Sequence, residues 1–144
     1  MIRYTDFRKH QSPGQSVVEF AFVLPVLLLL MVALIELGIL FYTQMAVCNA
    51  AWEGARAGAT IVNPAVGDQE IIGAAEAAAY GLDPHLLAVD IEPDQHQPPR
   101  NQPFPAPRGS PLTVMVTYRV RLTFPDVIVP VTGRAVTRME YHNP

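Results

Sequence analysis

Residues 14–60 of this chain read GQSVVEFAFVLPVLLLLMVALIELGILFYTQMAVCNAAWEGARAGAT, and the other predicted elements follow this segment. Nearly every residue from Phe20 to Tyr42 is apolar. At about 1.5 Å per residue, a helix over that run can cross a hydrocarbon core of about 30 Å. The sequence therefore predicts a membrane-spanning helix that continues into water beyond Tyr42.

The charges that flank the apolar run predict the orientation of the helix. Arg3, Arg8 and Lys9 precede the run, whereas no lysine or arginine follows it before Arg56. Because positively charged flanks stay on the cytoplasmic side, we expect a cytoplasmic N-terminus and an exported C-terminal part. The net charge of −3 comes without a basic stripe, so nucleic acid is not expected as a partner.

Two carboxylates, Glu19 and Glu36, interrupt the apolar segment. A charge left alone at the bilayer centre costs at least about 2.5 kcal/mol, so each is expected to have a partner or a function. About 25 Å of helix separates them, which is too far for a shared partner. For Glu36 two interpretations stay open: a protonated acid hydrogen-bonded within a helix bundle, or an ionic partner on another subunit.

Gly14 lies between a short basic leader and the apolar helix. Ser12, Pro13 and Gly14 predict an extended junction, and a glycine lets the backbone enter a protease closely. Cleavage after Gly14 would create an amine on Gln15, one helical turn from Glu19. Glu19 would then pair with its own or a neighbour's amine and fix the register of assembly. The alternative is that Glu19 reaches the membrane surface and is solvated there.

Small residues recur every four positions beyond the apolar run, which predicts a helix face that another element can approach closely. They are Ala46, Ala50, Gly54 and Gly58. Either the protein's own sheet or a second subunit is expected to pack there. The single cysteine, Cys48, excludes an intrachain disulfide. It leaves two interpretations, a small packed side chain or a disulfide between chains.

The rest of the chain predicts a small α+β domain. A short alanine-rich helix is expected over residues 69–80, with Asp68 as its N-cap. Alternating apolar residues predict three strands, at 87–92, 112–124 and 131–141. The last two strands are expected to pair antiparallel because the connection between them is short.

A proline-rich segment, residues 93–111, is predicted to be a loop. Its Arg100 and Arg108 would suit the binding of a partner, but a surface connection between strands is the simpler interpretation. Asp90 and Glu92, just before the loop, occupy the solvent face of the predicted strand, so a metal site is not expected.

No combination of residues supports catalysis. The four histidines are scattered without the spacing of a zinc site, and neither a phosphate-binding loop nor a nucleophile with its base is present. We therefore expect no enzyme activity, no cofactor and no small-molecule substrate.

The N-terminal block resembles the TadE-like family, the minor pilins or pseudopilins of tight-adherence (Flp) pilus systems. A basic leader, a glycine and a glutamate five positions after it look like the processing site of type IV pilin-like precursors. The resemblance includes Gly14-Gln15-Ser16, Val18-Glu19-Phe20, Leu24-Pro25, Ile35-Glu36-Leu37-Gly38 and the segment AAWEGAR at 50–56. It continues in the predicted strand at 114–125 and in residues 133–140.

This resemblance implies a bacterial inner-membrane precursor that a prepilin peptidase cuts after Gly14. The mature protein would act with other pilin-like subunits and the pilus assembly machinery to build Flp-type pili. The implied fold is a long N-terminal helix laid on an antiparallel three-stranded sheet. The expected parts are a leader at 1–14, a transmembrane and extended helix at 15–62, and an exported domain at 63–144. A permanently anchored periplasmic scaffold or binding module is the alternative, and it would need neither Gly14 nor Glu19.

Overall fold

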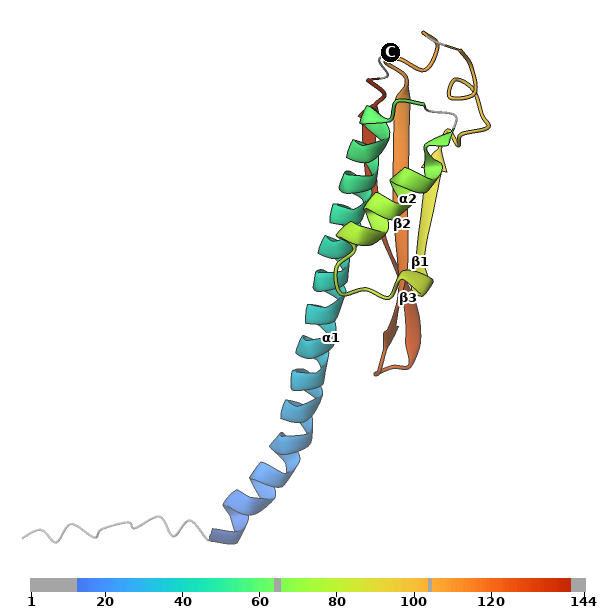
Figure 1. The fold of residues 1–144 in the computed structure, drawn as a ribbon. Helices are drawn as coiled ribbons and strands as arrows, with labels where there is room; N and C mark the ends of the chain where they lie inside the picture. The colour runs from blue at the N-terminus through green and yellow to red at the C-terminus, as the bar shows by residue number, and fades with distance from the viewer. Residues whose placement is uncertain (1–12, 64–65, 104, 141–144) are drawn as a thin grey trace, which may run out of the picture. The chain divides into compact units, whose positions relative to one another are not determined.

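The computed structural model describes residues 13–63, 66–103 and 105–140. Its helices are α1 (Pro13–Thr60), α2 (Asp68–Ala78) and a short 3-10 helix, Pro84–Leu86 (Figure 1). Its strands are β1 (Leu87–Glu92), β2 (Pro111–Leu122) and β3 (Val127–Arg138). The basic part of the predicted leader and the predicted end of the last strand, Tyr141, lie outside the described residues.

The chain divides into two compact units, with the boundary between Ile35 and Glu36. In the first unit, α1 exposes nearly all its apolar side chains from Val17 to Ile35, and Pro25 lies within the helix without ending it. By length and composition α1 can cross a membrane, with an 18-residue window of mean hydropathy 2.8. The first unit is therefore compatible with a single-pass membrane anchor.

The second unit contains an antiparallel sheet of order β1-β2-β3, which confirms the predicted α+β architecture. β2 and β3 pair along their whole length, from Pro111 opposite Arg138 to Leu122 opposite Val127. β3 begins at Val127, earlier than the predicted residue 131. The reason is that the short turn at 123–126 allows the two strands to pair immediately on either side of it.

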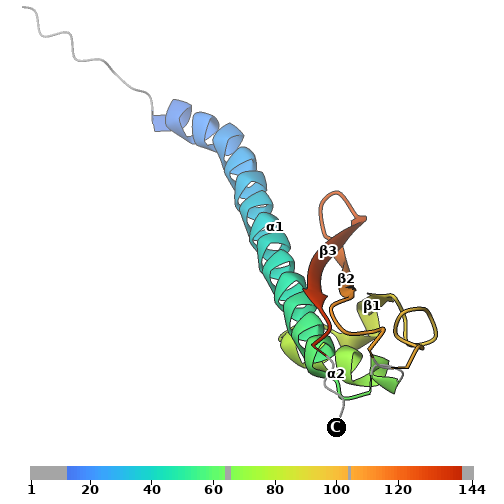
Figure 2. The ribbon, with the colours of Figure 1, turned by 90° about the horizontal axis from the view of Figure 1, so that it is seen from above.

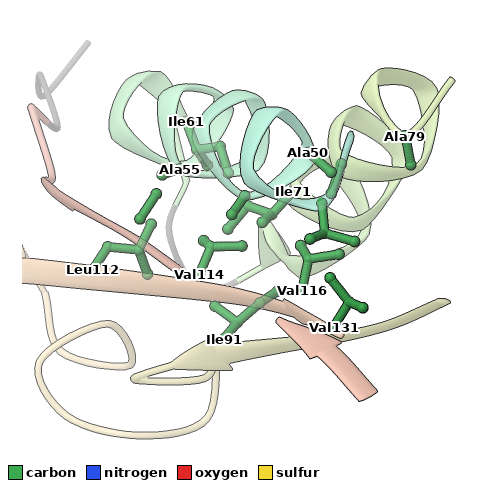
Figure 3. Close-up of a cluster of buried hydrophobic side chains, with 14 of the residues drawn as sticks. Ala50, Ala55, Ile61, Ile71, Ala79, Ile91, Leu112, Val114, Val116 and Val131 are labelled. Carbon is green, nitrogen blue, oxygen red and sulfur yellow. The ribbon is translucent and has the colours of Figure 1, made fainter. Parts of the chain in front are cut away.

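The part of α1 in the second unit and α2 cover the same face of the sheet (Figure 2). The hydrophobic core lies between these helices and the strands (Figure 3). Leu112, Val114 and Val116 of β2 are fully buried and point toward the helices (Figure 3). Burial of each such side chain stabilises the fold by about 1.5–3 kcal/mol. These buried residues alternate with partly buried ones, in agreement with the alternation of apolar and other residues from which the strand was predicted.

The second half of α1 lies along β2 and β3, and hydrogen bonds join helix and sheet at three levels. They connect Glu36 with Thr123, Gln44 with Thr132, and Ala59 with Glu140. β3 therefore runs in the same direction as α1, and β2 runs in the opposite direction. The lengths agree, since residues 36–60 make about 37 Å of helix and a twelve-residue strand spans about 40 Å.

α2 begins at Asp68 itself, and the N-cap position belongs to Gly67. The prediction of Asp68 as the N-cap was therefore wrong by one position. The Asp68 carboxylate has other partners, because it accepts a hydrogen bond from the Gln95 backbone N–H and forms an ion pair with Arg100. After α2, Gly81 adopts a φ of +79°, a conformation that residues with a Cβ rarely take.

Candidate processing site and assembly surfaces

Gly14 and Gln15 lie in the first turn of α1. The sequence predicted an extended junction ending at Gly14, and this prediction was wrong for Pro13 and Gly14, because α1 begins at Pro13. A protease that binds an extended chain would first have to unwind this turn. The first turn is the easiest part of a helix to open because its N–H groups have no partners in the preceding chain. Among the described residues, no atom outside the helix's own adjacent backbone lies within 4 Å of the position that a Cβ on Gly14 would take.

Glu19 lies one helical turn after Gln15, and the two side chains are in contact. Gln15 Nε2 donates a hydrogen bond of 3.2 Å to Glu19 Oε1. Both residues are exposed. The helix therefore holds the Glu19 carboxylate close to the residue that would carry the new amine after cleavage, as the spacing of four positions predicts.

Glu36 has a partner that neither sequence interpretation named. Its Oε1 accepts hydrogen bonds from the backbone N–H groups of Thr123 (2.7 Å) and Phe124 (2.8 Å), which follow the end of β2. Hydrogen bonds from N–H groups to a carboxylate are stronger than those between neutral groups. The Glu36 side chain thus fastens the turn between β2 and β3 to α1. Sequence reasoning missed this contact because it joins residues 87 positions apart.

A second charged contact fixes the same turn. Arg121 Nε lies 2.9 Å from Asp126 Oδ1, and its second guanidinium nitrogen lies 3.1 Å from Oδ2. This paired hydrogen bonding lowers the pKa of Asp126 and raises that of Arg121. Because the carboxyl pKa is lowered, the pair stabilises the fold at pH values above the ordinary aspartate pKa. This contribution is lost as the pH falls from that value through the lowered pKa of the folded protein. The effect is small because both side chains are exposed.

The predicted small-residue face of α1 is covered by the protein's own sheet and by α2. Ala46 and Ala50 are buried, as are Gly54 and Gly58. A Cβ on Gly54 would lie 3.2 Å from a methyl group of Val114, and one on Gly58 would overlap a methyl group of β2. Of the two alternatives for this face, the protein's own domain is therefore the one that the structure contains.

Gly133 of β3 is a second place where only a glycine fits, and it meets the backbone of α1. A Cβ there would lie 2.5 Å from the carbonyl oxygen of Val47 and 2.7 Å from the backbone nitrogen of Cys48. Nearby, Gln44 Nε2 donates hydrogen bonds to the Thr132 carbonyl (3.1 Å) and to Cys48 Sγ (3.2 Å). Cys48 is half-buried in this contact.

The opposite face of α1 in the second unit is exposed and apolar. Phe41, Met45 and Trp52 are 63, 68 and 62% exposed, and their spacing places them along one side of the helix. We call these three residues the outer stripe. Beside it, Glu53 and Arg56 form an ion pair of 2.6 Å that is itself exposed. A row of large apolar side chains on an exposed helix face suits contact with another protein.

The proline-rich loop after β1 is anchored by Arg100, whose side chain is almost completely buried. Its guanidinium pairs with Asp68 at the start of α2 and donates a hydrogen bond of 2.9 Å to the Pro93 carbonyl. Arg108 in the same loop is exposed. Arg100 is thus a structural residue that ties the loop to α2. Because its side chain is buried, it is not accessible to a partner, although the sequence allowed that interpretation.

Replacement of Arg100 with methionine is expected to destabilise the second unit by about 3–5 kcal/mol, since it leaves the Asp68 carboxylate without its cation. Thermal unfolding of the full chain in detergent measures this. Arg108→Met is the matched control, because it removes the same charge from an exposed position and should leave the unfolding temperature nearly unchanged. Adding Asp68→Asn to Arg100→Met should recover part of the loss. Equal unfolding temperatures for the two single variants would contradict the anchoring role.

The described residues offer no metal site, since nowhere in 13–63, 66–103 or 105–140 do three histidine, cysteine, aspartate or glutamate side chains gather. Asp90 and Glu92 lie exposed on β1, on the solvent face that the alternation predicts. His85 and His96 lie in separate turns, where their backbone N–H groups donate to Asp83 and Asp94.

The comparison with protein families gives a match over residues 14–56, which contain Gly14, Glu19, Glu36 and the outer stripe. The family is TadE, the TadE-like proteins. The TadE-like resemblance inferred from the sequence is confirmed over this segment. TadE-like proteins are involved in Tad/Flp pilus systems. The sheet lies outside the matched TadE-like segment. No curated protein and no solved structure matches the chain.

Proposed function

We propose that this protein is a minor pilin or pseudopilin-like subunit for the assembly of Flp-type, tight-adherence pili, and that a prepilin peptidase cuts it after Gly14. The match of residues 14–56 to the TadE-like family carries the proposal, because that segment begins at the glycine before the proposed cut. By this proposal the precursor resides in the bacterial inner membrane with its N-terminus in the cytoplasm and its sheet exported.

Glu19 and the outer stripe have separate roles in this proposal. Cleavage creates an amine on Gln15 next to the Glu19 carboxylate, which then pairs with its own or a neighbouring subunit's amine. An apolar setting makes either charge costly alone, so the pair fixes the axial register of neighbouring helices. The outer stripe binds the helix of another pilin-like subunit. The outer stripe is available for this contact because its side chains are exposed. The small-residue face is not available, since the sheet and α2 already cover it.

The size of the second unit supports a minor role. A major Flp pilin, by the family resemblance, is little more than the helix, whereas this chain adds a three-stranded sheet and a second helix. The alternative function is a permanently anchored periplasmic scaffold or binding module. Both functions place α1 in the membrane, and they differ in whether the leader is removed.

The N-terminal residue of the protein purified from its native membrane distinguishes the two functions. Intact mass and terminal sequencing should give Gln15 as the first residue in cells that contain an active prepilin peptidase. In cells that lack the peptidase, the chain should begin at Met1. A start at Met1 in both strains would overturn the proposed processing and leave the permanent anchor.

Polar replacements in the outer stripe should abolish assembly without unfolding the protein. In the double variant Met45→Gln and Trp52→Gln, the exposed side chains lose their apolar surface while the core stays intact. We expect a normal unfolding temperature and the loss of most surface pili, counted by electron microscopy. Val136→Gln is the matched control, since Val136 is 52% exposed on β3, away from the helix. Normal piliation in the double variant would contradict the role of the stripe.

A further inference from the structure

The turn between β2 and β3 exposes a group of large apolar side chains. Phe124 and Ile128 are each 65% exposed, and Val127 is 41% exposed. We call these three residues the hairpin tip. Its position along the helix is fixed, because the Thr123 and Phe124 N–H groups bind the Glu36 carboxylate. The hairpin tip therefore lies beside the first residues of the second unit.

α1 is also apolar at this level. Leu37 and Ile39 are each 47% exposed, and they follow Glu36 directly in the helix. Large apolar side chains on the helix and on the hairpin tip thus occur together at one end of the second unit. Exposed apolar residues scattered singly need no explanation, whereas a group formed by two elements marks an interaction surface.

α1 runs without a break from the first unit into the second. The length of helix in the first unit therefore indicates which surface lies next to this end of the second unit. Residues 20–35 make about 24 Å of helix, and residues 15–35 make about 31 Å, which matches a hydrocarbon core of about 30 Å. If these residues cross the bilayer, Glu36 lies at its outer surface whatever the angle between the two units. The span is then shorter than the apolar run from Phe20 to Tyr42, whose last residues lie in the second unit.

We propose that the hairpin tip inserts into the outer interface of the bilayer, so that the exported unit contacts lipid through two elements, α1 and the β2–β3 turn. Two features of the turn suit an apolar environment. Glu36 satisfies the N–H groups of Thr123 and Phe124, which would otherwise lose their hydrogen bonds to water. Asp126 is paired with Arg121, so the turn carries no unpaired acid toward the lipid. The inference depends on membrane anchoring, which both candidate functions share.

Site-specific fluorescence tests this contact in the full-length protein. With Cys48→Ala as background, a single cysteine at Ile128 carries a polarity-sensitive dye, and the protein is reconstituted in phosphatidylcholine vesicles. Val136→Cys is the matched control, because it is exposed on the same strand about 26 Å from Ile128. Leu29→Cys, in the first unit, reports the membrane span itself. Quenching is measured with iodide on both sides of the membrane and with nitroxide lipids labelled near the headgroup.

We expect the dye at Ile128 to show blue-shifted emission, quenching by the nitroxide lipids and no quenching by iodide. The dye at Val136 should show no blue shift and no quenching by the nitroxide lipids, and iodide should quench it. Equal iodide quenching at both positions, with Leu29 protected, would overturn the hairpin contact alone. Exposure of Leu29 to iodide would overturn membrane anchoring, and with it the inference. Protection of Ile128 that disappears on dilution of protein in lipid would assign the surface to a second copy of the chain and contradict the lipid contact.

Discussion

Cells that express the Gly14→Val variant should accumulate the full-length precursor and no chain that begins at Gln15. The reason is steric, because a β-branched side chain before the scissile bond prevents close approach of the extended backbone to the protease. Gly14→Ala should be cut slowly. Alanine favours the helix by about 1 kcal/mol over glycine, which alone lowers the unwound fraction of the first turn about fivefold.

The matched control for Gly14 is Gly38→Ala in the same helix. At both glycines, no other side chain or distant backbone atom among the described residues lies within 4 Å of the position that a Cβ would take, so neither replacement disturbs the packing that the structure describes. The Gly38 variant should be cut at the normal rate, as measured by pulse-labelling and intact mass. If Gly14→Val were processed as fast as the unchanged protein, the glycine would have no part in cleavage.

Replacement of Gly133 with valine should destabilise the second unit by about 3 kcal/mol or more. Its side chain would meet main-chain atoms of Val47 and Cys48 at 2.5–2.7 Å, and the backbones of a helix and a strand cannot turn aside as a side chain can. Overpacking usually costs about 1–3 kcal/mol, and a clash between two backbones lies at or above the top of that range. Such a loss is large against a typical domain stability of about 5–15 kcal/mol.

Limited proteolysis and near-ultraviolet circular dichroism of the full chain in detergent would detect this loss. Gly73→Ala in α2 is the control, since nothing lies within 4 Å of its added Cβ and alanine is the better helix former. Its unfolding temperature should stay the same or rise. A Gly133→Val protein with an unchanged unfolding temperature would show that α1 and β3 do not make this contact.

The repeating patterns of the sequence predicted the secondary structure well. Twenty or more apolar residues predicted α1, and alternation in β2 identified its buried residues Leu112, Val114 and Val116. These patterns are local, because the period of a helix or a strand is set by the backbone within a few residues. The spacing of four positions between Gln15 and Glu19 is also a local pattern, because one turn of the helix brings the two side chains together.

The contacts between segments that are distant in the sequence could not be predicted in this way. Glu36 binds the β2–β3 turn, Gly133 meets Val47, and Arg100 pairs with Asp68. In each case a single polar residue or glycine meets a partner far along the chain, and no period marks the pair. The sequence showed that Glu36 needed a partner, but burial cost alone does not say whether that partner is a side chain, a backbone N–H group or another subunit.

The three levels of hydrogen bonding between α1 and the sheet also determine how the second unit responds to mechanical force. A pull along α1 loads the contacts at Glu36, Gln44 and Ala59 in shear, so all three levels share the tension and must break together. A pull across the helix would instead peel them apart one after another. A pull on α1 along its axis would therefore carry the sheet along, because three levels of hydrogen bonding share the load.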